Sequence, residues 1–215
     1  MTEFGGSAHF REGLALKNLL LIISIFLLTA TSALGGGFLY HSDGPYKGKV
    51  IDLETGEPIE GAVVAGTWIL LVLSGSPRFC DAKETVTDKN GEFIFPKASC
   101  FTLWPIAKLD FAEVVVFKPG YLAYPPLGST FEERKARMPG FTGYEFQDKK
   151  EYCIIRLGKP KTREEREFTF DHSGSPFMFD ESFKKLPILL KMINEEGKNL
   201  GLRGEIGPGY DWRKK

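Results

Sequence analysis

The residues of this chain that could support acid–base or metal chemistry are few and scattered. Its three histidines are His9, His41 and His172. None has His-x-x-x-His spacing, and the one His-x-x-Glu pair, His9 with Glu12, lies near the N-terminus, so the folded part shows no set of zinc ligands. The chain also lacks a Cys-x-x-Cys pair and a Gly-x-x-x-x-Gly-Lys-Ser/Thr phosphate loop. We therefore predict no catalytic, cofactor-binding or metal-binding residues.

Asp171-His172-Ser173 contains the three residue types of a hydrolase triad. Triad members normally come from separate segments, because neighbouring side chains seldom point at one another in the required relay. No Gly-x-Ser-x-Gly nucleophile elbow is present either. A hydrolase with a site built from the loops 124–150 and 171–176 is therefore only a third hypothesis.

The segment Asp88-Lys-Asn90-Gly91-Glu92 is similar to the opening of a calcium-binding loop. The rest of the EF-hand pattern is missing, because the chain continues directly as Phe93-Ile94-Phe95. Asn-Gly accepts positive φ readily and is a strong β-hairpin signal between two strand-like runs. We predict a hairpin turn here, with calcium binding by loop carboxylates as the alternative.

Six aromatic residues could matter for binding or for the core: Trp68, Phe101, Trp104, Phe111, Tyr121 and Tyr124. Rings exposed in a row could stack on sugar faces. The same rings supply a large share of the area that a core buries. We interpret them as core residues, and a carbohydrate-binding module with exposed aromatics is the alternative.

Cys80, Cys100 and Cys153 are an odd number of cysteines, so one disulfide can form in an oxidising compartment. Cys80 and Cys100 both lie near predicted loop or strand ends, and we predict that these two pair. Cys153 lies in the strand-like run 152–157 and is expected to be a small core residue.

Size and charge set the broad class of the protein. The 215 residues carry 28 basic and 28 acidic side chains, so no net field would attract nucleic acid or an acidic substrate. The length suits one domain, or one domain with appendages.

Residues 1–35 differ from the rest of the chain. Arg11 and Lys17 precede an apolar run from Leu19 to Leu28, and small residues follow. This order is typical of a secretory signal peptide. Residues 18–34 are also just long enough to cross a bilayer, which takes about 17–25 residues. We predict export to the periplasm, cell envelope or exterior, with 1–35 a cleaved signal peptide or an uncleaved membrane anchor.

Residues 44–158 are expected to form one β unit with an insertion at 124–150. The predicted strands are 46–52, 62–73, 84–87, 92–95, 113–118 and 152–157. The second strand has apolar residues on both faces, which indicates burial on both sides. Several short strands separated by turns favour a sandwich or barrel. The insertion, with a short helix expected at 132–138, is a candidate binding loop.

Residues 159–215 are expected to comprise a charged connector and a C-terminal helix. The connector, 159–167, reads as a solvated segment. Apolar residues fall on one face of a helix at about 186–200, with Pro187 in its first turn and Gly201 as its stop. Gly197 weakens that helix by roughly 1 kcal/mol relative to alanine. We expect the helix to pack on its own β unit, with packing on another chain as the alternative.

Four stretches together carry a resemblance to a known family: Gly48-x-Val50, 55–64 (Thr-Gly-x-Pro-Ile-x-Gly-Ala-x-Val), 87–93 (Thr-Asp-x-Asn-Gly-x-Phe) and 118–121 (Lys-Pro-Gly-Tyr). Over about residues 45–125 the chain resembles the carboxypeptidase regulatory-like domain. The resemblance implies a mainly β fold, a transthyretin-like antiparallel β-sandwich, here followed by a C-terminal helix. Such domains are accessory modules, beside the catalytic domain in carboxypeptidases and also on exported and cell-envelope proteins.

No peptidase domain accompanies the module here, so the resemblance does not imply peptidase activity. The related transthyretin-like hydrolases end in Tyr-Arg-Gly-Ser and use histidines, whereas this chain ends Tyr210-Asp-Trp-Arg-Lys-Lys215. We therefore predict a non-enzymatic exported cell-envelope protein that binds or assembles with a protein or glycan partner. Addition of a partner strand to an open sheet edge is one such mode.

Overall fold

We describe the fold from a computed structural model, which describes residues 17–25, 40–72, 75–102, 107–125, 132, 136, 152–172, 177, 179–202 and 205–208. This part of the chain is mainly β, as predicted. Its strands are β1 (Tyr40–Asp43), β2 (Tyr46–Asp52), β3 (Val63–Leu71), β4 (Pro77–Val86), β5 (Glu92–Phe95), β6 (Ala98–Phe101), β7 (Lys108–Phe117) and β8 (Cys153–Leu157). Its helices include α3 (Arg163–His172), α4 (Asp180–Lys185) and α5 (Pro187–Asn199).

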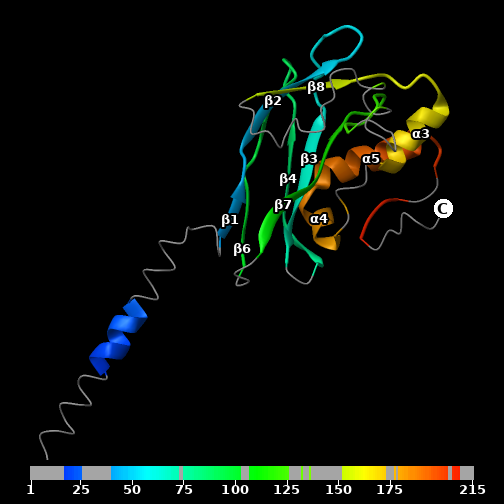
Figure 1. The fold of residues 1–215 in the computed structure, drawn as a ribbon. Helices are drawn as coiled ribbons and strands as arrows, with labels where there is room; N and C mark the ends of the chain where they lie inside the picture. The colour runs from blue at the N-terminus through cyan, green and yellow to red at the C-terminus, as the bar shows by residue number, and fades with distance from the viewer. Residues whose placement is uncertain are drawn as a thin grey trace, which may run out of the picture.

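The strands form three sheets (Figure 1). The sheet β4-β3-β7 is antiparallel, β5-β2-β8 is a second three-stranded sheet, and β1 pairs with β6 in a two-stranded ribbon. The expectation of a wholly antiparallel unit is wrong at β8, which runs parallel to β2. A parallel pair cannot be joined by a hairpin and needs a long connection. Here β3 to β7 lie in the chain between β2 and β8 and supply it.

One apolar core lies between the two three-stranded sheets. Val50, Phe95 and Ile155 of β5-β2-β8 pack in one cluster with Val64 and Trp68 of β4-β3-β7. The Trp68 and Phe95 rings stack, with their centroids 5.4 Å apart. Burial of rings and branched side chains from both sheets holds them face to face.

Helices α4 and α5 pack against the other face of β4-β3-β7 (Figure 1). Val63 and Ala65 of β3 share a second apolar cluster with Leu189 and Ile193 of α5. Strand β3 is therefore buried on both faces, as predicted, and the C-terminal helix packs on its own β unit. The helix expected at about 186–200 is confirmed, with Pro187 in its first turn.

Two glycines of the C-terminal region have different roles. Gly201 follows α5 with a φ of 71°, which confirms it as the helix stop. Gly197 lies inside α5, and a Cβ on it would come within 2.9 Å of the Phe170 ring of α3. The glycine that weakens the helix therefore lets α3 approach α5 closely.

The turn at Asp88–Gly91 is present, but the prediction that it forms a β-hairpin is wrong. β4 pairs with β3, whereas β5 pairs with β2, so the turn carries the chain from one sheet to the other. Gly91 has a φ of 72°, and a Cβ on it would collide with the carbonyl oxygen of Val50. Both the backbone conformation and the space therefore require glycine.

Four described elements have no predicted counterpart: β1, β6, α3 and α4. In addition, β4 and β7 begin at Pro77 and Lys108, well before the strands predicted at 84–87 and 113–118. β1 precedes the expected start of the β unit at residue 44, and α3 takes in residues 163–167, which we expected to be a solvated connector. β1 and β6 have four residues each and α4 has six, so none carries a clear hydrophobic period. Contacts with the rest of the domain hold them instead.

The predicted disulfide is confirmed between Cys80 of β4 and Cys100 of β6, with the two Cα atoms 5.5 Å apart. Cys153 is buried, as expected, and its thiol donates a hydrogen bond to the Lys47 carbonyl at 3.4 Å. The disulfide ties the β1–β6 ribbon to the edge strand β4.

The N-terminal region is described only in part. Residues 17–25 are helical, and their side chains, mostly leucine and isoleucine, are exposed on all sides. Within the described ranges, no helix is long and apolar enough to cross a membrane. The other residues of 1–35 lie outside the described ranges. So does the 124–150 insertion apart from residues 124, 125, 132 and 136.

Candidate functional site

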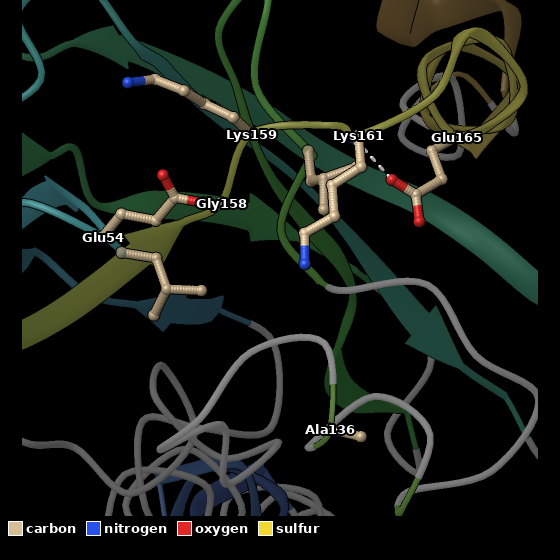
Figure 2. A pocket seen from close by; sticks show the side chains of 8 residues that line it. Glu54, Ala136, Gly158, Lys159, Lys161 and Glu165 are labelled. Atoms are coloured by element: carbon tan, nitrogen blue, oxygen red, sulfur yellow. Dashed lines mark hydrogen bonds between the residues drawn. The ribbon is translucent and has the colours of Figure 1, made fainter.

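A pocket of about 290 Å³ lies where β8 leads toward α3 (Figure 2). Leu53 and Leu122 form an apolar part of its wall, and lysine and glutamate side chains add positive and negative charges. Its lining residues are Leu53, Glu54, Leu122, Ala136, Gly158, Lys159, Lys161 and Glu165. Two positive and two negative side chains offset one another, so the lining itself has little net attraction for an ion.

Asp52, the last residue of β2, precedes the lining residue Leu53 and is almost wholly buried. Its carboxylate has four polar partners. Oδ1 accepts from the backbone N–H groups of Glu54, at 2.8 Å, and Thr55, at 3.1 Å. Oδ2 lies 3.0 Å from Lys159 Nζ and accepts from the Tyr121 hydroxyl at 3.3 Å. Burial opposes ionisation, but these donors outweigh it and hold the pKa of Asp52 at about 2.

The two side-chain partners of Asp52 are held in their ordinary protonation states. Burial and the neighbouring carboxylate of Asp52 raise the pKa of Tyr121, so its hydroxyl stays protonated at neutral pH. The hydrogen bond to Asp52 raises the pKa of Lys159, whose ammonium also lies 5.6 Å from the centre of the Tyr121 ring. Neither group is prepared to act as a base, and the cluster joins β2 to the segment after β8.

Thr162 and Glu165 form a reciprocal cap at the start of α3. The Glu165 backbone N–H donates to Thr162 Oγ1 at 3.2 Å, and Glu165 Oε2 accepts from the Lys161 N–H at 2.7 Å (Figure 2). The first bond satisfies one of the N–H groups that a helix start leaves without a partner, and the second ties Lys161, just before the cap residue, to the first turn. The polar lining on this side of the pocket therefore also has a local structural role.

A second polar cluster holds β1 to the body of the domain. Asp43 accepts hydrogen bonds from Trp68 Nε1 at 2.8 Å and from the Tyr46 hydroxyl at 2.6 Å. Burial and the bond to Asp43 raise the pKa of Tyr46, so the hydroxyl remains a donor. Nearby in sequence, His41 is buried opposite Cys100, and its Nε2 is the one buried side-chain nitrogen or oxygen among the described residues without a hydrogen-bond partner.

A third cluster centres on Asp81 of β4, which is also buried. Oδ1 accepts from Lys185 Nζ of α4 at 2.6 Å, and Oδ2 accepts from the Ser99 N–H of β6 and lies 3.2 Å from Lys83 Nζ. Burial opposes ionisation, but these donors lower the pKa of Asp81. The ionised carboxylate thus links a sheet, a helix and the ribbon.

Asp88, the first residue of the calcium-like segment, uses its carboxylate in the turn. Oδ1 accepts from the backbone N–H groups of Asn90 and Glu92, both at 2.8 Å. This Asx-type bonding confirms the turn interpretation. No group of three or more histidine, cysteine or acidic residues that could hold a metal lies within the part of the chain that is described.

The six aromatic residues do not gather on one surface where they are described. Trp68 and Tyr124 are buried, Tyr121 is half-buried, and Phe101 is exposed. Trp104 and the side chain of Phe111 lie outside the description, as do Ser173 and the side chains of Asp171 and His172. The prediction of core packing is confirmed for Trp68 and Tyr124.

The sequence analysis missed the Asp52–Tyr121–Lys159 cluster, because its members are 69 and 38 residues apart in the chain. The signal that was available is an aspartate at a strand end just before a turn, which favours side-chain bonds to the following N–H groups.

Comparison of the chain with protein-family models, characterised proteins and solved structures finds no match.

Proposed function

We propose that the chain is an exported, non-enzymatic cell-envelope protein whose β domain serves in binding or assembly. The observation that carries the proposal is the Cys80–Cys100 disulfide, in a chain whose N-terminal region has an apolar run. Disulfides persist mainly in oxidising compartments. The N-terminal order of basic, then apolar, then small residues is typical of a signal peptide, which directs a chain to such a compartment.

The fold we propose for this domain is the transthyretin-like sandwich of the carboxypeptidase regulatory-like family. Two three-stranded sheets around one core support it. The glycines of the resembling stretches also support it, since Gly56, Gly61, Gly91 and Gly120 all have positive φ at turns. The parallel β8 departs from a wholly antiparallel sandwich.

The polar clusters support a non-enzymatic role. Asp52 and Asp81 are ionised, buried and bonded to backbone N–H groups and lysines, so their oxygens are occupied in holding segments together. A nucleophile or general base needs a partner within hydrogen-bond reach and a pKa near the working pH. The pKa values of these carboxylates are lowered, away from that range.

The test is to fractionate the producing cells, sequence the N-terminus of the mature chain and count its reactive thiols. We expect the chain outside the cytosol, with one thiol, Cys153, alkylated after denaturation and three after reduction. A Cys80→Ser variant is the matched control, because it should expose Cys100 to alkylation without reduction. A cytosolic chain with three reactive thiols before reduction would refute the proposal.

A further inference from the structure

One end of the domain presents two aromatic rings to solvent. Tyr40, the first residue of β1, is 51% exposed, and Phe101, the last residue of β6, is 64% exposed. The two are direct partners in the antiparallel ribbon. Directly opposed residues of an antiparallel pair lie side by side, so the rings form one exposed patch.

The same end carries a further apolar side chain and basic residues. The Cys80–Cys100 bond places the end of β6 beside the start of β4, where Pro77 pairs with Leu71 of β3. Leu71 is 36% exposed and also pairs with Lys108 of β7. Arg78 and Lys108 are exposed there too, with Asp110 the acidic residue nearby. We call Tyr40, Leu71, Arg78, Phe101 and Lys108 the ribbon end.

The ribbon that carries these rings is held firmly. Asp43 binds both Trp68 and Tyr46, which fastens β1, and the disulfide fastens β6. Two aromatic rings that stay exposed to water do not gain the free energy of burial, about 25 cal/mol for each Å² of apolar area. An exposed patch on a firm support is typical of a contact surface.

Chain geometry limits how far this end can lie from a membrane. The candidate membrane segment, residues 18–34, ends six residues before Tyr40. Six residues reach at most about 20 Å when fully extended. The headgroup layer is roughly 5–8 Å deep on each side of the hydrocarbon core, so Tyr40 must start close to it if residues 18–34 cross the bilayer. In Figure 1 the chain enters the domain through β1, beside β6.

We infer that residues 18–34 stay in the membrane and that the ribbon end rests on the headgroup layer of the same bilayer. Tyrosine suits this layer because its ring is apolar and its hydroxyl is polar. The wholly apolar ring of phenylalanine suits the boundary between headgroups and acyl chains. Arg78 and Lys108 would meet anionic lipid phosphates. The inference rests on the proposed export and adds the surface that the domain binds.

The experiment uses the full chain reconstituted into vesicles of phosphatidylcholine and phosphatidylglycerol with acyl chains brominated near the headgroup. Phe101→Trp places a fluorescent probe in the ribbon end, and Tyr40→Trp is a second probe if the first variant misfolds. The matched control is Ile154→Trp on β8, an exposed strand residue at 44% exposure. We expect brominated lipid to quench the emission added at residue 101 or 40, and not the emission added at 154.

Each outcome decides the inference. Flotation with the vesicles together with selective quenching at the ribbon end supports it. Flotation without quenching of the ribbon-end probe, or with equal quenching at residue 154, overturns the contact between the ribbon end and the headgroups. Such a result still agrees with residues 18–34 in the membrane. A chain that does not float overturns both, while an oxidised Cys80–Cys100 pair in cells would still support export. A change in the residue 101 probe caused by soluble oligosaccharides and not by vesicles would overturn the inference in favour of a glycan surface.

Discussion

Replacing Gly197 by alanine tests the close packing of α3 on α5. Gly197 is buried, and a Cβ there would lie 2.9 Å from Phe170 Cε2 and 3.1 Å from Phe170 Cζ. Phe170 is only 4% exposed and belongs to the apolar cluster under the helices. The ring therefore has little room to move away from a new methyl group.

Two opposing effects decide the sign of the change. Alanine inside a helix is favoured over glycine by about 1 kcal/mol. Overpacking a well-filled core costs typically about 1–3 kcal/mol. Because Phe170 is enclosed, we expect the steric cost to exceed the helix-propensity gain, so Gly197→Ala should lower the free energy of unfolding by about 1 kcal/mol, the difference between the two effects.

The assay is urea unfolding of four proteins: the parent, Gly197→Ala, Phe170→Leu and the double variant. Leucine removes the ring atoms that the methyl group would meet. In the Phe170→Leu background, Gly197→Ala should therefore stabilise the protein by up to about 1 kcal/mol, its helix-propensity gain. The coupling between the two changes should be of opposite sign to the Gly197→Ala effect alone.

Asn199→Ala, at the exposed end of α5, is the control and should change stability by less than about 0.5 kcal/mol. The reasoning fails if Gly197→Ala stabilises the parent, or if its effect is the same in both backgrounds. Either result would mean that the α3–α5 contact does not require glycine.

Three other perturbations have distinct expected outcomes. Replacing Cys80 and Cys100 by serine opens a loop with a sequence separation of 20 and should cost about 3 kcal/mol of unfolding free energy in urea. Glu84→Ala removes the carboxylate that accepts the first N–H groups of α5 at 2.8 and 2.9 Å, and should cost about 1 kcal/mol, as for other lost helix caps. The pKa of Asp52 is depressed from 3.8 to about 2, so its stabilisation is complete above pH 4 and is lost as pH falls toward 2; Asp52→Asn should flatten this part of the stability profile, measured by thermal unfolding.

Matched measurements separate these effects from general damage. Reduction of the parent should reproduce the loss seen on replacing Cys80 and Cys100, and an unchanged midpoint after reduction would contradict the disulfide. Glu60→Ala, at an exposed turn, should be neutral beside Glu84→Ala. If Asp52→Asn and the parent lose stability equally between pH 4 and pH 2, the low pKa of Asp52 is wrong.

Much of the β pattern could be predicted because it is local. β2 and β5 begin and end at the predicted residues, Tyr46–Asp52 and Glu92–Phe95, and α5 lies within the predicted range. Alternating or continuous apolar residues between glycine-containing turns mark such strands without any knowledge of their partners. Pro119-Gly120 is also a local turn signal, and Gly120 has a φ of 84° in the structure.

Partner choice could not be predicted in the same way. The strands on either side of Asn90-Gly91 look like a hairpin in sequence, yet each pairs with a different sheet. A turn residue specifies backbone angles but not the strand that lies alongside, which depends on burial of both faces across the whole domain. The Asp52–Lys159 ion pair depends on the parallel pairing of β2 with β8, which brings residue 159 next to β2.

The sequence by itself determined the mainly β character, the positions of the turns, the C-terminal helix and the identity of the disulfide pair. These follow from local periodicity and backbone preference. The disulfide prediction follows from the positions of Cys80 and Cys100 near loop or strand ends and of Cys153 within a strand-like run. The tertiary structure alone decided that β8 is parallel to β2, that Gly197 lets α3 pack closely on α5, and that Tyr40 and Phe101 lie side by side and exposed. Those features depend on contacts between distant segments, whose free energy is set by burial and packing rather than by neighbouring residues.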